Sequence, residues 1–255
     1  MIPVLVFLAG YTLSVVTITV GYHRGLAHDA VSLSPTLRRF VLTFGNWITG
    51  LDPKGWAVMH RRHHAFSDTE FDPHSPENVG LFGILLEQLR SYKATLRGLA
   101  RDDPEYTRFA EGLDFELNWL NKNRLWWLPY AVHPACGLLL ALTVGPWIGL
   151  AWTLGILSHP LQGGAVNALG HSIGGRNFAT PDQSTNNLPA AILIAGEGYQ
   201  NNHHAWPDSA RFSYQPWEVD WGFGACLLLE GFGLVTVRYD ALIPSPAAVK
   251  SSAIS

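Results

Sequence analysis

The stretch IPVLVFLAGYTLSVVTITVGYHRGLAH, residues 2–28, decides the fold, because it joins a long apolar run to a pair of histidines. Residues 2–21 carry no charge, and about 20 apolar residues suffice for a helix to cross the hydrocarbon core of a bilayer. No basic residue precedes Pro3 and no small-residue cleavage site precedes Tyr22, so a cleaved signal peptide fits poorly. The sequence therefore predicts a membrane-spanning helix that brings His23 and His28 to the membrane surface.

Two further apolar runs, residues 125–145 and 147–166, are broken at Gly145-Pro146 and predict a helical hairpin with tryptophans near its ends. Residues 39–51 are apolar but too short to span, which favours an interfacial or re-entrant segment. We therefore expect an all-α integral membrane fold with about three transmembrane helices. Residues 1–243 are predicted to form a single domain, followed by a disordered tail over residues 244–255.

The distribution of charged residues predicts which side of the membrane the polar segments occupy. The hairpin returns the chain to the side it left, so the polar blocks, with nearly every Lys and Arg, lie on one face. The positive-inside tendency makes this face cytoplasmic. We expect a multi-pass protein in the lipid bilayer whose cytoplasmic helical cap carries the histidines.

Composition excludes several functions. Hydrophobic residues make up 47% and charged residues 15% of the chain, against about 25% charged in an average soluble domain. The formal charge of -3 argues against nucleic-acid binding. The two cysteines, Cys136 and Cys226, lie in apolar runs, which favours two free thiols over a disulfide. Two thiols are also too few for an iron–sulfur cluster, which takes about four, so any electrons must come from a partner.

Eight of the eleven histidines fall in four compact groups that each follow an apolar segment. The groups are His23-x4-His28, His60-x2-His63-His64, Asn167-x3-His171 and Gln200-x2-His203-His204. Residues three or four apart share a helix face, so His60 can chelate with either His63 or His64. His23 and His28 are five apart, which an α-helix would splay, and we expect the helix to fray near Gly25.

Eight convergent imidazoles exceed the usual coordination of one ion and predict two metals. Imidazoles without thiolates suit iron, copper, zinc or nickel, and iron is preferred because its open positions permit dioxygen chemistry. The Glu-x-x-His pattern of di-iron carboxylate bundles does not occur. The lone His74, His133 and His159 are interpreted as structural, with His74 in the Asp72-Pro-His74 turn as a residue that could orient a ligand.

These motifs resemble the membrane fatty-acid desaturase family, most closely its acyl-CoA (stearoyl-CoA type) Δ9 branch. The resemblance runs from Gly21 to about Tyr239 and includes the three histidine boxes, the Asn167/His171 pair and the continuation AFSDTEFDPH of the second box, residues 65–74. Gln200 stands where the third box usually begins with histidine. The amide could bind a metal through its oxygen, hold a water or leave that iron more open.

The resemblance implies a dioxygen-dependent desaturase that uses two irons and an external ferredoxin, rubredoxin or cytochrome b5 type electron donor. The substrate would be a fatty-acyl thioester or an acyl lipid. Asn167 and Gln200 would hold a metal-bound water, and Glu197 would orient a ligand histidine. Related hydroxylases or acetylenases are the nearest alternatives, and a metal-binding or metal-transporting membrane protein is the non-enzymatic one. A transporter, however, should carry ionisable residues along its spans.

Substrate contacts are less determined by the sequence. Trp47 and Trp56, with Phe44 and Trp152, are candidates to line an apolar tunnel for the acyl chain, or they simply pack. Arg24, with Lys54, Arg61 and Arg62, is a candidate to contact a thioester carrier, lipid headgroups or the electron donor. Solvated interfacial cations are the alternative for all four.

Overall fold

A computed structural model describes residues 1–240, so the tail predicted over residues 244–255 lies outside the described residues. The elements in chain order are α1 (Ile2–Val16), η1 (Thr17–Ala27), β1 (Val31–Leu33), α2 (Pro35–Thr49), α3 (Pro53–Phe66), α4 (Pro76–Leu99), α5 (Pro104–Thr107), η2 (Arg108–Ala110), α6 (Trp119–Lys122), α7 (Leu128–Thr143), α8 (Pro146–Ile156), α9 (His159–Gly170), α10 (Leu188–Leu193), α11 (Gln200–Ala205), α12 (Trp221–Gly231) and β2 (Val235–Val237).

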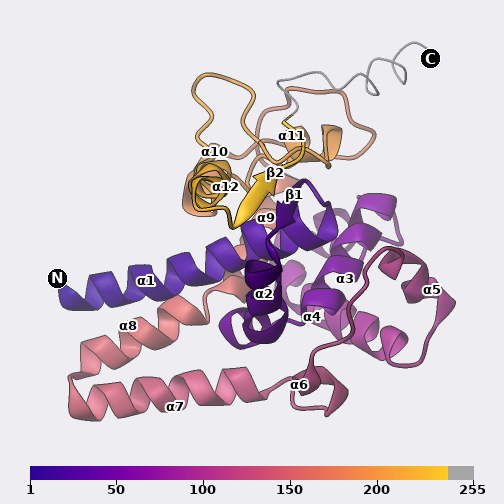
Figure 1. Ribbon diagram of the computed structural model, residues 1–255. Coiled ribbons are helices and arrows are strands. Elements are labelled where there is room, and N and C mark those ends of the chain that lie inside the picture. The colour runs from indigo at the N-terminus through magenta and orange to yellow at the C-terminus, as the bar shows by residue number, and fades with distance from the viewer. Residues whose placement is uncertain (241–255) are drawn as a thin grey trace.

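The molecule has two parts. Helices α1, α7 and α8 lie side by side and project from the rest of the chain; we call them the stalk (Figure 1). The other elements form the cap, into which α1 continues as η1. Within the cap, β1 pairs with β2, the last element of the described chain, in antiparallel register with Val31 opposite Val237. The fold is mostly helical, as predicted, but the all-α description omitted this small sheet.

Small residues bring the stalk helices together. A Cβ added at Gly155 would lie 2.5 Å from the backbone oxygen of Phe7, and one added at Gly10 would lie 2.9 Å from the backbone nitrogen of Ile156. Small residues permit such a close approach of two helix backbones. The outer faces of the stalk expose large apolar side chains, among them Leu138, Leu142 and Trp147.

One of the three predicted spans is long enough to cross a bilayer by itself. The continuous helix Ile2–Ala27 has 26 residues, whereas α7 has 16 and α8 has 11. At 1.5 Å per residue α7 is about 24 Å long, against about 30 Å for a hydrocarbon core. The predicted hairpin is present, but its second arm ends at Ile156 instead of running to residue 166, and α9 begins separately at His159.

Helices α2 and α3 each begin at a residue whose side chain caps the helix N-terminus. Ser34 caps α2 by accepting a hydrogen bond from the amide of Leu37, and the helix ends at Gly50, whose φ of 77° is in the left-handed region. Asp52 then caps α3 by accepting from the amides of Lys54 and Gly55. This carboxylate is fully buried and also accepts from the Asn118 amide at 2.7 Å. The start of α3 is therefore fixed, which positions the three histidines at its other end.

Candidate metal centre

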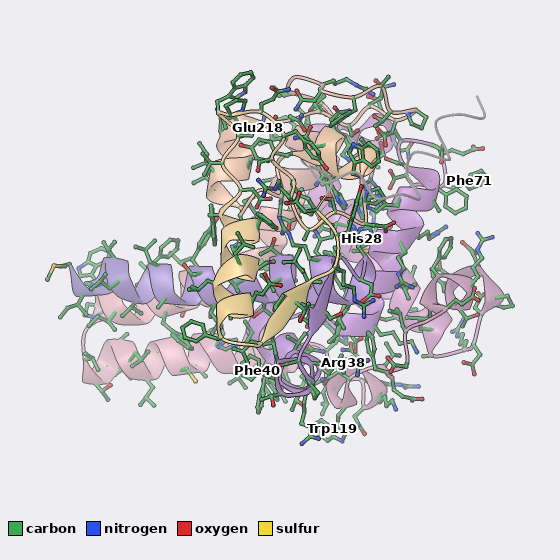
Figure 2. The ribbon with its side chains drawn as sticks, turned by 45° about the horizontal axis from the view of Figure 1, so that its top comes forward. His28, Arg38, Phe40, Phe71, Trp119 and Glu218 are labelled. Carbon is green, nitrogen blue, oxygen red and sulfur yellow. The ribbon has the colours of Figure 1, made fainter. Side chains whose placement is uncertain are left out.

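The eight clustered histidines converge inside the cap as two groups. We call His23, His28, His60, His64 and His203 site 1, and His63, His171 and His204 site 2; within each group the candidate ligand atoms lie within 4.8 Å of one another. In Figure 2 the label of His28 lies among the crowded side chains of the cap, whereas Phe71 projects from its edge. Residues from four separate stretches of the chain thus meet in one place.

A π-helix brings His23 and His28 together. Over Thr17–Ala27 the backbone forms a π-helix, and the amide of His28 donates to the carbonyl of His23 at 3.1 Å. Hydrogen bonding from residue i to i+5 closes one wider turn, so ligands five apart lie on one face, with ring centroids 5.1 Å apart. The prediction of fraying near Gly25 is wrong: the helix continues past it in a different hydrogen-bond register.

Helices α3 and α11 each contribute to both sites. His60 and His64 are one α-helical turn apart and join site 1, while His63 turns to site 2. On α11, His203 joins site 1 and His204 joins site 2. Adjacent helical residues point about 100° apart, so one short helix can supply both groups. The sequence left open whether His60 pairs with His63 or His64, and the geometry pairs it with His64.

The nitrogen spacing in site 1 suits a shared metal ion. Four Nε2–Nε2 separations link the five rings: 2.9 Å for His23–His203, 2.9 Å for His64–His203, 3.0 Å for His60–His64 and 2.8 Å for His28–His60. Metal–imidazole bonds of about 2.1 Å at right angles place neighbouring nitrogens about 3.0 Å apart. The five rings therefore fit the coordination sphere of one ion.

The hydrogen bonds of site 2 orient its three histidine rings for metal binding. The Nδ1 atoms of His63, His171 and His204 each bond a carboxylate, from Asp72 at 3.0 Å, Asp68 at 2.8 Å and Asp182 at 2.5 Å. Their Nε2 atoms are buried and have no hydrogen-bond partner among residues 1–240. A proton held at Nδ1 leaves the Nε2 lone pair for a metal, which is how ligand histidines are oriented in metal sites.

Burial favours the neutral form of four site 1 rings. The pKa values of His28, His60, His64 and His203 are well below the ordinary histidine value, first because burial disfavours the charged ring and second because neighbouring imidazoles repel a proton. Neutral imidazole is the form that binds metals. In site 2, burial likewise lowers the pKa of His204, to about 4.

The carboxylates of site 2 stay charged. Burial by itself would raise their pKa values, but the hydrogen-bonded histidines hold the pKa of Asp68, Asp72 and Asp182 below the ordinary value. The Asp72 carboxylate in turn outweighs burial at His63 and raises the pKa of that ring. Asp68, Asp72 and Asp182 were missed by the sequence-based prediction. The first two lie inside the quoted continuation of the second histidine box, whereas no local signal marked Asp182.

Glu197 lies behind site 1. Its Oε2 bonds His23 Nδ1 at 2.6 Å, and its Oε1 accepts from Arg24 at 3.0 Å and from the Thr19 hydroxyl. Arg24 is fully buried between Glu197 and Asp220, and its guanidinium lies 3.8 Å from the centre of the Phe212 ring. The suggestion that Arg24 contacts a carrier, a headgroup or an electron donor is therefore wrong, because the side chain does not reach the surface.

Of the other predicted site residues, some lie beside the metal centre and others do not. Trp56 stacks on His60 at 4.8 Å between ring centroids and lines a small cavity beside site 1, together with Asn167 and Gln200. Asn167 donates to Gln88 at 3.2 Å, and Gln200 donates to the Glu197 carbonyl at 2.8 Å. Trp47 is not among the side chains that line this cavity; its carbonyl bonds His133. Cys136 and Cys226 are both free thiols, as expected.

His74 and His159 are nearer the centre than their structural interpretation suggested. The His74 ring stacks on His63 at 4.6 Å, and its ligand atom groups with those of His63 and Asp72. His159 lines the same cavity as His74. The sequence offered one hint, because His74 ends the continuation of the second box.

Comparison with known proteins identifies the family of the chain. A family model described as fatty acid desaturase matches residues 1–219. The chain is 30% identical over 96% of its length to hex-5-enoyl-[acyl-carrier protein] acetylenase of Moorena producens, covering 78% of that protein. It is 31% identical over 90% of its length to icosanoyl-CoA 5-desaturase of Limnanthes douglasii, covering 62% of it, and 33% identical over 86% to sn-1 stearoyl-lipid 9-desaturase of Anabaena variabilis, covering 77% of it.

The chain belongs to the fatty acid desaturase family. It is an oxidoreductase that acts on fatty acids, and its histidine clusters form a candidate metal centre. The resemblance drawn from the histidine boxes is thereby confirmed.

Proposed function

We propose that this chain is a dioxygen-dependent fatty-acyl desaturase with two irons, one held by the five histidines of site 1 and one by the three histidines of site 2. The observation that carries the proposal is the pattern at site 2, where three carboxylates hold the Nδ1 atoms while the buried Nε2 atoms meet no hydrogen-bond partner in the described part of the chain. When bound, the iron pair would supply dioxygen activation and the removal of two hydrogens from neighbouring methylenes.

The protein's own residues position the acyl chain and exclude water. Trp56, stacked on His60, forms one wall of the cavity beside site 1, and Met59 from the same helix lies in its lining. Glu197 fixes the orientation of His23. Burial by itself would raise the pKa of this carboxyl, but His23 and then Arg24 hold it below the ordinary value. Such fixed placement is the main contribution a protein makes to cofactor chemistry.

We propose that the stalk lies in the bilayer, with α1, α7 and α8 as the three predicted membrane segments. Their exposed apolar side chains support this, and so does the exposed apolar row on α4, which includes Phe82 and Leu86. Since η1 leads directly from the stalk to His23 and His28, the metal sites would lie at the membrane boundary. The positive-inside tendency makes that side cytoplasmic.

A groove of about 1390 Å³ is the proposed entry for the substrate. Six cations line it, with two acidic residues: Lys54, Lys93, Arg97, Arg101, Lys122 and Arg124, against Asp102 and Glu116. Met59 and Gln88 line both this groove and the cavity beside site 1. A fatty-acyl group attached to an anionic carrier, as a thioester or a phospholipid, fits a basic groove that leads to the centre. Electrons would come from an external ferredoxin, rubredoxin or cytochrome b5 type donor.

Acetylene formation is the second candidate. It is favoured by the likeness to an enzyme named as an acetylenase and by Gln200, which stands in the third box where a histidine is usual. Hydroxylation is the third outcome that such a centre allows.

The test is acyl profiling by mass spectrometry of a host that expresses the chain, with His63→Ala as the matched inactive control. We expect a product that has lost two hydrogens and purified protein with two irons per chain. Loss of four hydrogens from a saturated chain indicates the acetylenase, and gain of one oxygen indicates a hydroxylase. An unchanged acyl profile together with one zinc and no iron contradicts the proposal.

A further inference from the structure

The cavity beside site 1, about 60 Å³ in volume, has a mixed lining. Val15, Ile18 and Ile194 contribute apolar side chains, as a hydrocarbon chain requires. Helix α9 contributes the polar residues His159 and Gln162, which we call the polar wall. These two residues are three apart on the helix and therefore share one face.

Several polar atoms on this wall have no partner. Both ring nitrogens of His159 and Oε1 of Gln162 are buried without a hydrogen bond to any residue in the described part of the chain. The exposed fractions of these side chains are only 4% and 6%. More than about 90% of buried polar groups in proteins are hydrogen-bonded, and an unpaired one costs about 1–3 kcal/mol. Unpaired groups gathered on one cavity wall indicate a ligand that can bond them.

The orientation of the Gln162 amide is fixed by its neighbour. The Ser158 hydroxyl donates to the Gly155 carbonyl at 2.6 Å, so its oxygen can only accept from Gln162 Nε2, also at 2.6 Å. The amide oxygen of Gln162 is therefore the atom left over, and it is an acceptor. A neutral His159 ring offers one N–H donor and one acceptor nitrogen. A hydroxyl group, which donates one hydrogen bond and accepts another, matches this pair. A keto oxygen only accepts, so it would leave Gln162 Oε1 unpaired.

We propose that the substrate is an acyl chain that bears a hydroxyl group near the reacting carbons, recognised by His159 and Gln162. This rests on the proposed acyl-chain function, because His23 and His60 of site 1 line the same cavity and place the hydroxyl close to the centre. A plain hydrocarbon would leave the polar wall unpaired, which lowers its affinity relative to the hydroxylated chain. Both residues therefore act in substrate specificity.

The experiment measures binding, not turnover. The metal-loaded protein in nanodiscs is titrated calorimetrically with dodecanoyl N-acetylcysteamine and with its monohydroxylated isomers, carrying the hydroxyl at successive chain positions. We expect at least one isomer to bind about tenfold more tightly than the plain chain, the equivalent of one well-made hydrogen bond. The variants His159→Phe and Gln162→Met should each remove this preference while the plain chain binds no more weakly. Gln215→Met, a glutamine that does not line the cavity, is the matched control and should retain it.

Equal binding of the plain chain and every hydroxylated isomer overturns the inference, as does a preference that survives in both variants. If the plain chain is nevertheless desaturated, water fills the polar wall and the proposed function stands without the inference. A hydroxyl preference in a protein that never converts an acyl chain supports the binding site and contradicts the desaturase proposal.

Discussion

Replacing Asp182 by asparagine tests whether the site 2 carboxylates tune a metal. The Asp182 carboxylate holds His204 Nδ1 at 2.5 Å and is itself fixed by the Ser184 amide at 3.1 Å and the Thr180 hydroxyl at 2.7 Å. Asparagine keeps the shape of the side chain and one acceptor oxygen, but it removes the charge and replaces the second acceptor oxygen by an amino donor. Loss of such a partner typically weakens metal binding by about 10- to 100-fold. This corresponds to about 1.4–2.8 kcal/mol at 1.4 kcal/mol per tenfold.

The assay is anaerobic competition for Fe²⁺ between the purified protein and a chelator of known affinity. Two binding events per chain are expected in the unchanged protein, and in Asp182→Asn only one of them should weaken. The control is Asp114→Asn, which removes a carboxylate whose side chain is 79% exposed and paired with Arg38. If both events keep their affinity in Asp182→Asn, or the control loses as much, the role of the carboxylate is refuted.

Four further predictions concern separate parts of the chain. His63→Ala and His64→Ala should each lower the iron content from two to one. Because His63 belongs to site 2 and His64 to site 1, the iron that remains should be a different one in each variant. The Mössbauer signals of the remaining iron should therefore differ between the variants, and identical signals would contradict the assignment. Gln200→His should stay active and retain the second metal more strongly against chelators, so an inactive variant would mean that the amide has a specialised role. Arg24→Met should cost about 3–5 kcal/mol by removing the cation that pairs with the buried carboxylates of Glu197 and Asp220, seen as a fall in Tm of roughly 10 °C. An unchanged Tm with a raised KM would instead indicate substrate contact. Gly155→Leu should destabilise the stalk by about 1–3 kcal/mol through overpacking against Phe7, whereas a leucine at the open Gly224 should do so far less in the same thermal scan.

Much of the centre could be predicted from local spacing. Ligands one turn apart, such as His60 and His64, share a face whatever the tertiary fold, and apolar segments before each group determine where the groups emerge. The division into two sites could not be predicted, because His63 is equally able by spacing to join His60. That choice depends on Asp72, which approaches from the loop after the helix.

Features that depend on distant contacts escaped prediction for the same reason. Asp182 precedes His204 by 22 residues and meets it only once the cap has folded. The sheet joins three residues near each end of the described chain, too few for an alternating pattern. Arg24 was read as a surface cation because nothing near it in sequence reveals Glu197 and Asp220, which arrive from more than 170 residues away.

The wide helical turn at the end of η1 links main-chain hydrogen bonding to metal binding at site 1. The His28 amide bonds the carbonyl of His23, one residue earlier than an α-helix would use. Moving that single amide to the carbonyl of Arg24 would rotate the His28 ring away from its four companions without breaking a covalent bond. An ion that requires both rings therefore stabilises one pattern of main-chain hydrogen bonding over the other. Metal affinity at site 1 and helix winding at the end of η1 are then two measures of the same equilibrium.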